Sequence, residues 1–283
     1  MVATLRHLFS LLVLTCFCST PVVSLHAEDL FPDKGLEAAV RKEVFAKRYN
    51  TEPLTKDDVK NISQVMGKGK GIKSLAGLEH CVAVQEIDLE NNEITDLAPL
   101  SGLKLVQSLT LAHNKIESIA PLAELERLQY LELSGNAVSD LAPLAKMTNM
   151  RSLYLSDNKI TKIDVVKGLK KTWTLYLAGN KVEDFSPIGE LKWLTSLDLR
   201  GCNLEKLDFL KPLTELNYVM LAENKITDLS TLVEMAKADQ QKRFAPFWRL
   251  YLYDNPLSEK AKTEQVAELK SIGARITLEK PSK

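Results

Sequence analysis

Few side chains in this sequence are of the kinds that carry out nucleophilic or metal chemistry. Outside the first 27 residues there are two cysteines, Cys81 and Cys202, and two histidines, His80 and His113. A zinc site needs three or four ligands at fixed geometry, so we interpret the two histidines as surface residues. No Cys/His or Ser/His/Asp spacing resembles a nucleophile motif. The sequence therefore predicts no catalytic residue, no metal site and no cofactor.

Cys202 is explained by a repeated unit rather than by chemistry. It lies in LDLRGCNLEKL, and four nearby stretches of almost the same pattern, such as LTLAHNKIESI, carry Asn in its place. The unit Leu-x-Leu-x-x-Asn-x-Ile recurs in steps of 22 residues, and its last copy follows after 31. The repeated position is occupied by Asn92, Asn114, Asn136, Asn158, Asn180, Cys202, Asn224 and Asn255. Cys202 is therefore predicted to replace a corner asparagine as a buried, reduced thiol.

Each unit has the pattern of one coil of a solenoid. In Leu-x-Leu, alternate side chains point to one face of a strand, so Leu109 and Leu111 point inward and Thr110 outward. The Asn amide can pair with backbone groups that the corner would otherwise bury. Prolines such as Pro99 and Pro143 suit an irregular or 3₁₀ return limb. One coil cannot bury its own apolar face, so the coils must stack with their strands in a parallel sheet.

Two further features follow from the coil register. Cys81 and Cys202 lie five coils apart, or about 24 Å at the spacing of sheet strands. A disulfide needs Cα atoms within about 7 Å, so none is expected. Asp residues recur in every second coil, and we interpret them as caps of the return turns rather than as a calcium ladder. They are Asp96, Asp140, Asp184 and Asp228.

The unbroken 22-residue register and the tail ITDLAPL resemble the leucine-rich repeat family, specifically the bacterial internalin-like type. The resemblance implies an α/β solenoid: a right-handed superhelix with a concave parallel β-sheet, a helical N-terminal cap and an α/β C-terminal cap. We expect the repeats over residues 62–257, as one degenerate and eight full coils, with an insertion at about 236–246. The caps are expected at 28–61 and 258–283.

The ends of the chain carry helix signals and an export signal. Asp33 is a plausible N-cap for an amphipathic helix, and Gly273 a plausible helix stop before a closing strand. Residues 1–27 have the basic start, apolar run and small-residue end of a signal peptide. A lipoprotein site at Cys16 is disfavoured because Thr15 fits that pattern badly. The protein is therefore expected to be secreted or periplasmic.

Composition excludes some partner classes. The chain is 45% hydrophobic and 26% charged, which is ordinary for a globular protein with a sizeable core. Losing residues 1–27 removes one Arg and no acid from 37 basic and 37 acidic residues, leaving a net charge of about −1. This balance predicts no nucleic-acid partner, and the rest of the chain has no second hydrophobic span. We expect a monomer without an integral membrane segment.

The outward strand positions carry most of the aromatic residues. Six of the seven tyrosines fall on this face, with two of the three tryptophans. Exposed Tyr, Trp and Arg clusters are typical of binding surfaces, although aromatic neighbours also stabilise sheets. The predicted partner-binding residues are Tyr130, Tyr154, Trp173, Tyr176, Arg200, Tyr218, Met220, Trp248, Arg249, Tyr251 and Tyr253. An acidic patch is predicted beside them at Glu86, Asp88, Glu90 and Glu132.

These patterns favour a non-enzymatic recognition protein that binds a protein partner through the concave face. One alternative is binding of a glycan or cell-envelope polysaccharide by the same aromatic rings. A regulatory subunit of an enzyme is a third and less favoured hypothesis. The fold resemblance supports recognition as a class, while the partner must be argued from the surface.

Overall fold

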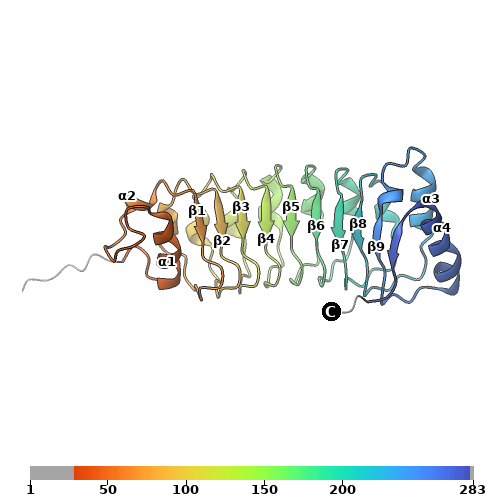
Figure 1. Cartoon of the computed structure of the whole chain (residues 1–283), viewed down its shortest axis with the longest axis horizontal. Helices are drawn as coiled ribbons and strands as arrows, with labels where there is room; N and C mark the ends of the chain where they lie inside the picture. Colours follow the sequence, from red (N-terminus) through yellow and green to blue (C-terminus); the bar gives the residue numbers. More distant parts are fainter. Residues whose placement is uncertain (1–28, 281–283) are drawn as a thin grey trace, which may run out of the picture.

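The structure is a computed structural model that describes residues 29–280, so the predicted signal peptide and Cys16 lie outside it. Ten strands form one parallel sheet in sequence order along the long axis of the molecule (Figure 1). The strands are β1 (Gln64–Met66), β2 (Glu86–Asp88), β3 (Ser108–Thr110), β4 (Tyr130–Glu132), β5 (Ser152–Tyr154), β6 (Thr174–Tyr176), β7 (Ser196–Asp198), β8 (Tyr218–Met220), β9 (Arg249–Tyr251) and β10 (Arg275–Thr277). This curved parallel sheet confirms the predicted solenoid.

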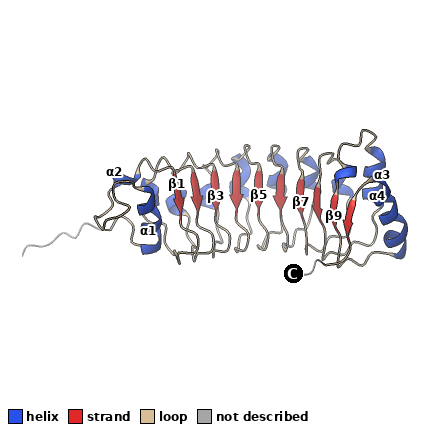
Figure 2. Cartoon of the chain, in the orientation of Figure 1, coloured by secondary structure: helices blue, strands red, loops and turns tan. Residues whose placement is uncertain are grey.

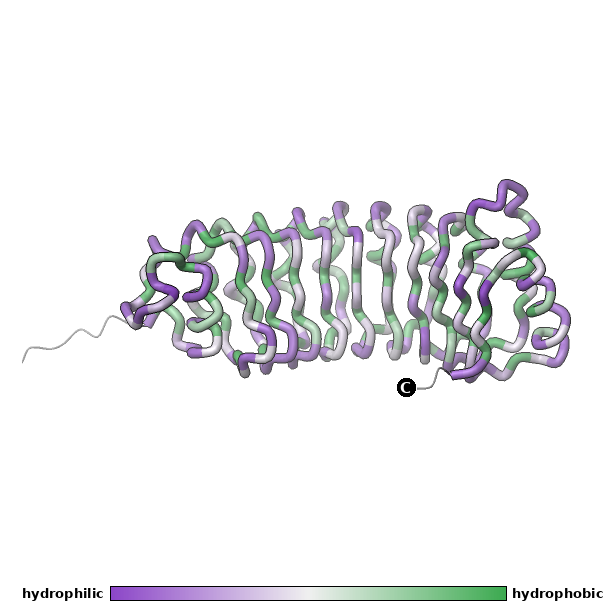
Figure 3. The backbone as a smooth tube through the Cα atoms, in the orientation of Figure 1, coloured by the Kyte–Doolittle hydropathy of each residue, from purple (hydrophilic) through white to green (hydrophobic). Residues whose placement is uncertain are grey.

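The repeat length sets the register of the sheet. Leu109 pairs with Leu131, which lies 22 residues later, and every strand from β1 to β8 continues this step. The middle residue of each of these strands is buried, and the residues on either side of it point out of the core. Hydrophobic and polar segments alternate along every coil (Figure 3). Inward leucines of successive coils therefore stack into one continuous core.

Short 3₁₀ helices form the return limb behind the sheet (Figure 2). They are η1 (Leu78–His80), η2 (Ala98–Leu100), η3 (Ala120–Leu122), η4 (Ala142–Lys146), η5 (Asp164–Gly168), η6 (Ser186–Glu190), η7 (Asp208–Leu210) and η8 (Ala245–Phe247). Three of the four recurrent aspartates, Asp96, Asp140 and Asp184, cap these turns, as predicted. Asp96 Oδ1, for example, accepts a hydrogen bond from the Ala98 N–H at 2.8 Å, and Asp140 Oδ1 accepts one from Ala142 at 2.9 Å.

The corner asparagines make the predicted ladder. Asn180 is fully buried, and its Oδ1 accepts the Ile160 N–H at 3.0 Å. Its Nδ2 donates to the carbonyls of Leu155 and Leu177, both at 2.9 Å. One side chain therefore joins the backbones of two neighbouring coils and closes its own corner.

Cys202 performs only part of the asparagine's role. The side chain is 2% exposed, and its Sγ lies 3.3 Å from the Leu177 carbonyl oxygen, where the thiol can donate. It has no oxygen to accept the Val182 N–H, which corresponds to the Ile160 N–H held by Asn180. The predicted burial of Cys202 is confirmed, and the substitution keeps the donor while losing the acceptor.

Helices lie at both ends of the sheet (Figure 1). At the N-terminal end are α1 (Lys34–Glu43), which packs on β1, and α2 (Lys56–Val59). At the other end are α3 (Ser230–Ala238), the single π-helical turn η9 (Ala261–Gln265) and α4 (Val266–Ile272), which precedes β10. The buried residues of α1 and α4 belong to the same core as the strand leucines. Among residues 29–280, no helix has the length and apolar content needed to cross a bilayer.

Asp33 connects α1 to the first coil. Its Oδ1 accepts the N–H groups of Gly35 and Leu36 at 2.9 and 3.1 Å, as an N-cap does. Its Oδ2 accepts the N–H groups of Lys73 and Ser74 at 2.7 and 3.1 Å. Partial burial raises the pKa of this carboxyl, but the four N–H donors outweigh that effect and hold the pKa below its ordinary value.

Asp33→Ala should therefore lower the free energy of unfolding at pH 7 by about 2 kcal/mol, since it removes a helix cap and two bonds to the next segment. The folded pKa lies below the unfolded one, so the Asp33 contribution is present above about pH 4 and is lost as the pH falls through the folded pKa. Urea unfolding should show the difference between wild type and variant shrinking between pH 7 and pH 3.

Asp57→Ala provides the control for the Asp33 variant. Asp57 lies in α2, is exposed and pairs only with Lys60, so its removal should change stability by less than about 0.5 kcal/mol. If Asp33→Ala and Asp57→Ala unfold alike at pH 7, the proposed connection between α1 and the first coil is wrong.

Candidate functional site

The outward side chains of the strands form the concave face, and most of the predicted partner-binding residues lie on it. Trp173, Tyr218 and Arg249 are exposed there. A second group is half-buried by its neighbours on the same face: Tyr130, Tyr154, Tyr176, Arg200, Met220 and Tyr251. The strand alternation thus places these side chains outside the leucine core.

Three tyrosine rings, those of Tyr130, Tyr154 and Tyr176, contact one another across β4, β5 and β6 and form the tyrosine stripe. The ring centroids of Tyr130 and Tyr154 are 5.3 Å apart, and those of Tyr154 and Tyr176 are 5.0 Å apart with planes at 85°. The Tyr176 hydroxyl lies 3.0 Å from the Ser196 hydroxyl. Burial raises the pKa of Tyr130 to about 12 and also raises the pKa of Tyr154. Both phenols are therefore neutral hydrogen-bonding groups at physiological pH.

Trp173 extends the aromatic surface beside the stripe. It immediately precedes β6 and is 47% exposed. The Arg151 guanidinium carbon lies 5.1 Å from the centroid of its ring, as in a cation–π pair. This contact fixes a large aromatic side chain on the surface without burying it.

The predicted acidic patch adjoins the tyrosine stripe. Glu86 is exposed, whereas Asp88, Glu90 and Glu132 are half-buried. Glu90 also pairs with Lys68 at 2.5 Å. Burial makes the largest contribution to the raised pKa of Tyr130, and Tyr154 makes the next largest. The negative charges of Glu132, Asp88 and Glu90 raise it further. The N-terminal end of the concave face is therefore negative up to the first ring of the stripe.

Arg200 is fixed by a buried acid rather than presented freely. Asp198 is 1% exposed, although it occupies an outward strand position. Arg200 Nε lies 2.9 Å from Asp198 Oδ1, and its Nη2 lies 2.6 Å from Oδ2. The hydrogen bonds to Asp198 raise the pKa of Arg200. Part of the predicted contact surface of Arg200 is thus occupied within the protein.

Trp248 is not on the concave face, contrary to the prediction. The side chain is completely buried, and its ring lies 5.4 Å from that of Phe244. The backbone N–H of Trp248 donates to the Ala245 carbonyl at 3.3 Å in η8, whereas the backbone N–H of Asn217, at the matching place of the previous coil, donates to the Thr195 carbonyl in the ladder. The buried indole N–H of Trp248 has no partner among the described residues. The insertion ahead of β9 therefore changes the path of the backbone just before the strand, and the indole turns inward.

Tyr253 is also buried, at 7% exposure, so its predicted role in partner contact is wrong. It occupies the row just past the second leucine, where other coils carry the buried Ala112, Ala178 and Ala222. Lys280 Nζ lies 5.8 Å from its ring centroid. In this coil the row therefore holds a buried ring rather than a presented one.

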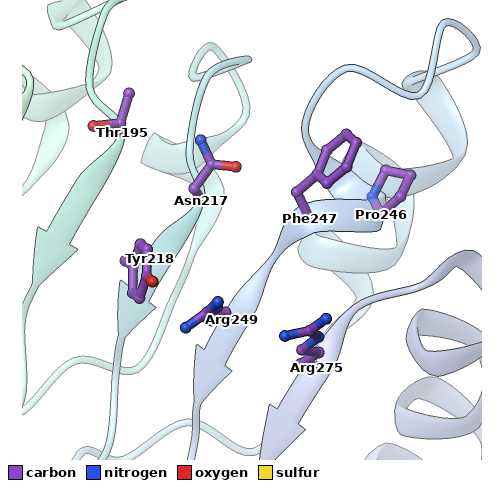
Figure 4. A pocket seen from close by; sticks show the side chains of 7 residues that line it. All are labelled: Thr195, Asn217, Tyr218, Pro246, Phe247, Arg249 and Arg275. Carbon is purple, nitrogen blue, oxygen red and sulfur yellow. The ribbon is translucent and has the colours of Figure 1, made fainter.

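A pocket at the C-terminal end of the concave face includes residues that the sequence interpretation missed. It has a volume of about 480 Å³ and lies over the starts of β8, β9 and β10 (Figure 4). Its lining residues are Thr195, Asn217, Tyr218, Pro246, Phe247, Arg249 and Arg275. Arg275 lies outside the 22-residue repeat, but the match between RITL at 275–278 and RLYL at 249–252 is a signal that could have found it.

The side chains with potential for chemistry do not converge. Cys81 and Cys202 are free and buried, and burial raises their pKa values to about 12 and about 11. In residues 29–280, no three His, Cys, Asp or Glu side chains are grouped as a metal site would require. The concave face is therefore the candidate site, and what it offers is a surface for contact.

Comparisons with known proteins agree with this geometry. Family models for leucine-rich repeats match residues 82–138, 126–171 (as two copies) and 190–206. Among curated proteins, none matches the sequence significantly. The solved structure of internalin C2 from Listeria monocytogenes is 26% identical, with a TM-score of 0.64, over 88% of this chain and 95% of that one.

Two more distant structures share the fold. A leucine-rich repeat protein of Leptospira interrogans is 21% identical over 71% of this chain and 62% of its own, with a TM-score of 0.58. The ectodomain of an Arabidopsis thaliana receptor kinase, solved in complex with Casparian strip integrity factor 2, is 20% identical over 72% of this chain and 29% of its own, with a TM-score of 0.59.

The stacked parallel strands, the asparagine ladder and these matches define a leucine-rich repeat protein. Its repeat length and its likeness to internalin C2 support the internalin-like type. Proteins built on this repeat are typically recognition scaffolds rather than enzymes.

Proposed function

We propose that this protein is exported and binds a protein partner through the concave face, with the tyrosine stripe and Trp173 as anchors. The observation that carries the proposal is the row of contacting rings of Tyr130, Tyr154 and Tyr176 on the outer side of the sheet. Tyrosine offers a large contact area with few rotatable bonds and a polar tip, so it recurs at binding hot spots. Export rests on the signal-like residues 1–27 and on the internalin-like resemblance.

A polypeptide fits this surface better than a glycan does. Sugar rings stack on open, flat aromatic faces, but the planes of Tyr154 and Tyr176 meet at 85°, so the two rings form no common platform. The stripe instead offers ring edges, hydroxyls and gaps into which side chains can insert. The negative patch at one end adds a contact for basic residues.

Tyr154→Ala/Tyr176→Ala should weaken partner binding by at least about 30-fold, which corresponds to the loss of one hot spot of about 2 kcal/mol. The partner would be captured on the wild-type protein from envelope and secreted fractions, purified, and then titrated against each variant. Melting temperatures would be recorded in parallel.

The chain offers a matched control on its other side. Phe185 and Phe209 form a second partly buried pair of rings, 5.5 Å apart, on the return limb. Phe185→Ala/Phe209→Ala should keep partner affinity within about 3-fold despite losing comparable packing. If the tyrosine variant loses affinity only in proportion to a large drop in melting temperature, the stripe is structural. If soluble polysaccharide displaces the partner, glycan binding is the better interpretation.

A further inference from the structure

Two arginines of the last two strands lie directly beside each other on the concave face. Arg249 opens β9, Arg275 opens β10, and the two residues are paired in the sheet register. Neighbouring strands are about 4.8 Å apart. Both side chains are exposed and point to the same side, next to Tyr218 and Phe247 (Figure 4). Like charges directly opposite on adjacent strands destabilise a sheet.

No other pair in the strand register of residues 29–280 joins two charges of the same sign. Where charged residues one coil apart lie in contact, opposite signs meet across the 22-residue step: Lys68 with Glu90 at 2.5 Å, Lys115 with Glu93 at 2.8 Å and Lys146 with Glu124 at 2.7 Å. Arg249 and Arg275 have no such partner, since no carboxylate of residues 29–280 forms an ion pair with either. The nearby Glu215 pairs with Arg243 instead.

Aromatic side chains hold and flank the two guanidinium groups. The guanidinium carbon of Arg249 lies 4.9 Å from the ring centroid of Tyr218, which supports one face of the group and leaves its N–H edges available. Phe247, 62% exposed, forms an apolar wall with Pro246. Asn217 adds an amide to the lining. The pocket thus combines paired N–H donors with an adjacent apolar surface.

We infer that this pocket binds the carboxylate of an Asp or Glu side chain on the polypeptide partner, with an apolar neighbour of that residue against Phe247. The inference rests on the proposed function and deepens it. Guanidinium groups bind carboxylates through paired N–H donors, and an anion between the two arginines removes their repulsion. The exposed phenyl ring selects an acidic residue that has an apolar neighbour on the same chain.

Negative and positive charges are therefore separated along the concave face. Its acidic patch lies over β2 to β4 and the arginine pocket over β8 to β10. Seven strand steps from β2 to β9 span about 34 Å, the length of roughly ten extended residues. A partner segment with basic residues at one end and an acidic residue at the other matches both ends.

The test uses labelled twelve-residue peptides, acetylated and amidated at their ends, in fluorescence anisotropy. One carries Lys-Lys near one end and Glu-Leu near the other, and a second carries Gln in place of Glu. A third peptide carries Gln in place of Glu and ends in a free C-terminal carboxylate instead of the amide. Each of the three peptides is also made with its sequence reversed. Wild-type protein should bind the Glu peptide at least 10-fold tighter than the Gln peptide in one of the two orders. Weak binding of all peptides, or no preference, would overturn the inference.

Variants then assign the preference to the arginines. Arg249→Gln/Arg275→Gln should reduce the Glu-to-Gln ratio to within 2-fold, and Arg249→Lys/Arg275→Lys, which keeps the charge but not the planar donors, should leave about 3-fold. Lys162→Gln/Lys206→Gln removes two exposed charges from the return side and should keep the full ratio. An unchanged ratio in the Gln variant would overturn the inference. Equal binding of the third peptide would overturn the assignment to an acidic side chain.

Two readouts separate this pocket from structural effects and from the tyrosine stripe. Because the Gln variant removes a like-charge contact, its melting temperature should equal or exceed that of wild type. A large drop together with the lost preference would show that the arginines are structural and would overturn the inference. Tyr154→Ala/Tyr176→Ala should weaken the binding of the Glu and Gln peptides alike and keep the Glu-to-Gln ratio. The proposed role of the stripe and that of the pocket can therefore be contradicted independently.

Discussion

Asn180→Ala should lower the free energy of unfolding by about 3 to 5 kcal/mol, although it removes only one small polar side chain. The variant leaves the buried Ile160 N–H without an acceptor. It also removes two further hydrogen bonds, to the Leu155 and Leu177 carbonyls, which keep Asn158 Nδ2 and Cys202 Sγ as their other side-chain donors. Each buried backbone group without a hydrogen bond costs about 1 to 3 kcal/mol. Since each coil contacts only its neighbours, the damage also weakens the stacking of two coils on each other.

Urea unfolding of two further variants makes the Asn180 prediction specific. Asn180→Cys reproduces the natural Cys202 position, with a donor but no oxygen acceptor, and should lose about half as much stability as the alanine variant. Asn149→Ala removes a surface asparagine whose bonds are to the Lys171 ammonium and to a carbonyl at 3.4 Å, and should cost less than about 1 kcal/mol. If Asn180→Ala and Asn149→Ala unfold at the same urea concentration, the ladder contributes little.

The backbone of this protein could be predicted from its sequence because each signal is local and repeated. The spacing of Leu109, Leu111 and Asn114 fixes strand, turn and inward face within one coil. The constant step of 22 residues then fixes how coils pair, since a slip by one residue would turn every leucine outward. Asp140 likewise predicts its own return turn from two residues away.

The exposure of single side chains on the concave face could not be predicted in the same way. Asp198 and Tyr176 occupy equivalent outward positions in adjacent strands, yet Asp198 is buried because Arg200 folds over it. Trp248 turns inward because the insertion before β9 places it after η8, where its backbone N–H bonds to Ala245 instead of to the previous coil, and the repeat pattern does not contain this segment. Exposure on this face depends on neighbours one coil away and on irregular segments, whereas the leucine pattern reports only the core.

The arginine pocket could not be predicted from the repeat because some of its residues lie outside the regular coils. Arg275 belongs to a strand outside the repeat register, and Phe247 follows the insertion. They lie beside Arg249 because β10 pairs with β9 at the end of the sheet and the insertion ends next to β9. The tyrosine stripe, in contrast, falls within regular coils, where the alternation of strand residues places Tyr154 and Tyr176 on one face.

Thiol labelling should be at least about 100-fold slower in the native protein than in unfolded protein at pH 8, for both Cys81 and Cys202. The thiolate is the reactive form. An ordinary pKa of 9.0 gives about 10% thiolate at this pH, while a pKa of about 11 for Cys202 gives about 0.1%, and the value of about 12 for Cys81 gives still less. Burial of both sulfurs adds a steric barrier to this effect.

Single variants distinguish the two thiols in protein that lacks residues 1–27, and with them Cys16 and Cys18. Cys202→Asn leaves only Cys81 and supplies the missing acceptor for the Val182 N–H, whereas Cys81→Ala leaves only Cys202. Because both thiolates stay a small minority, the ionisation effect predicts a rate that rises about 10-fold from pH 8 to pH 9 in either variant. Rapid labelling of the native Cys81→Ala protein would show that the Cys202 sulfur reaches solvent. It would then be a reactive group at the corner of the sixth coil rather than a substitute for asparagine.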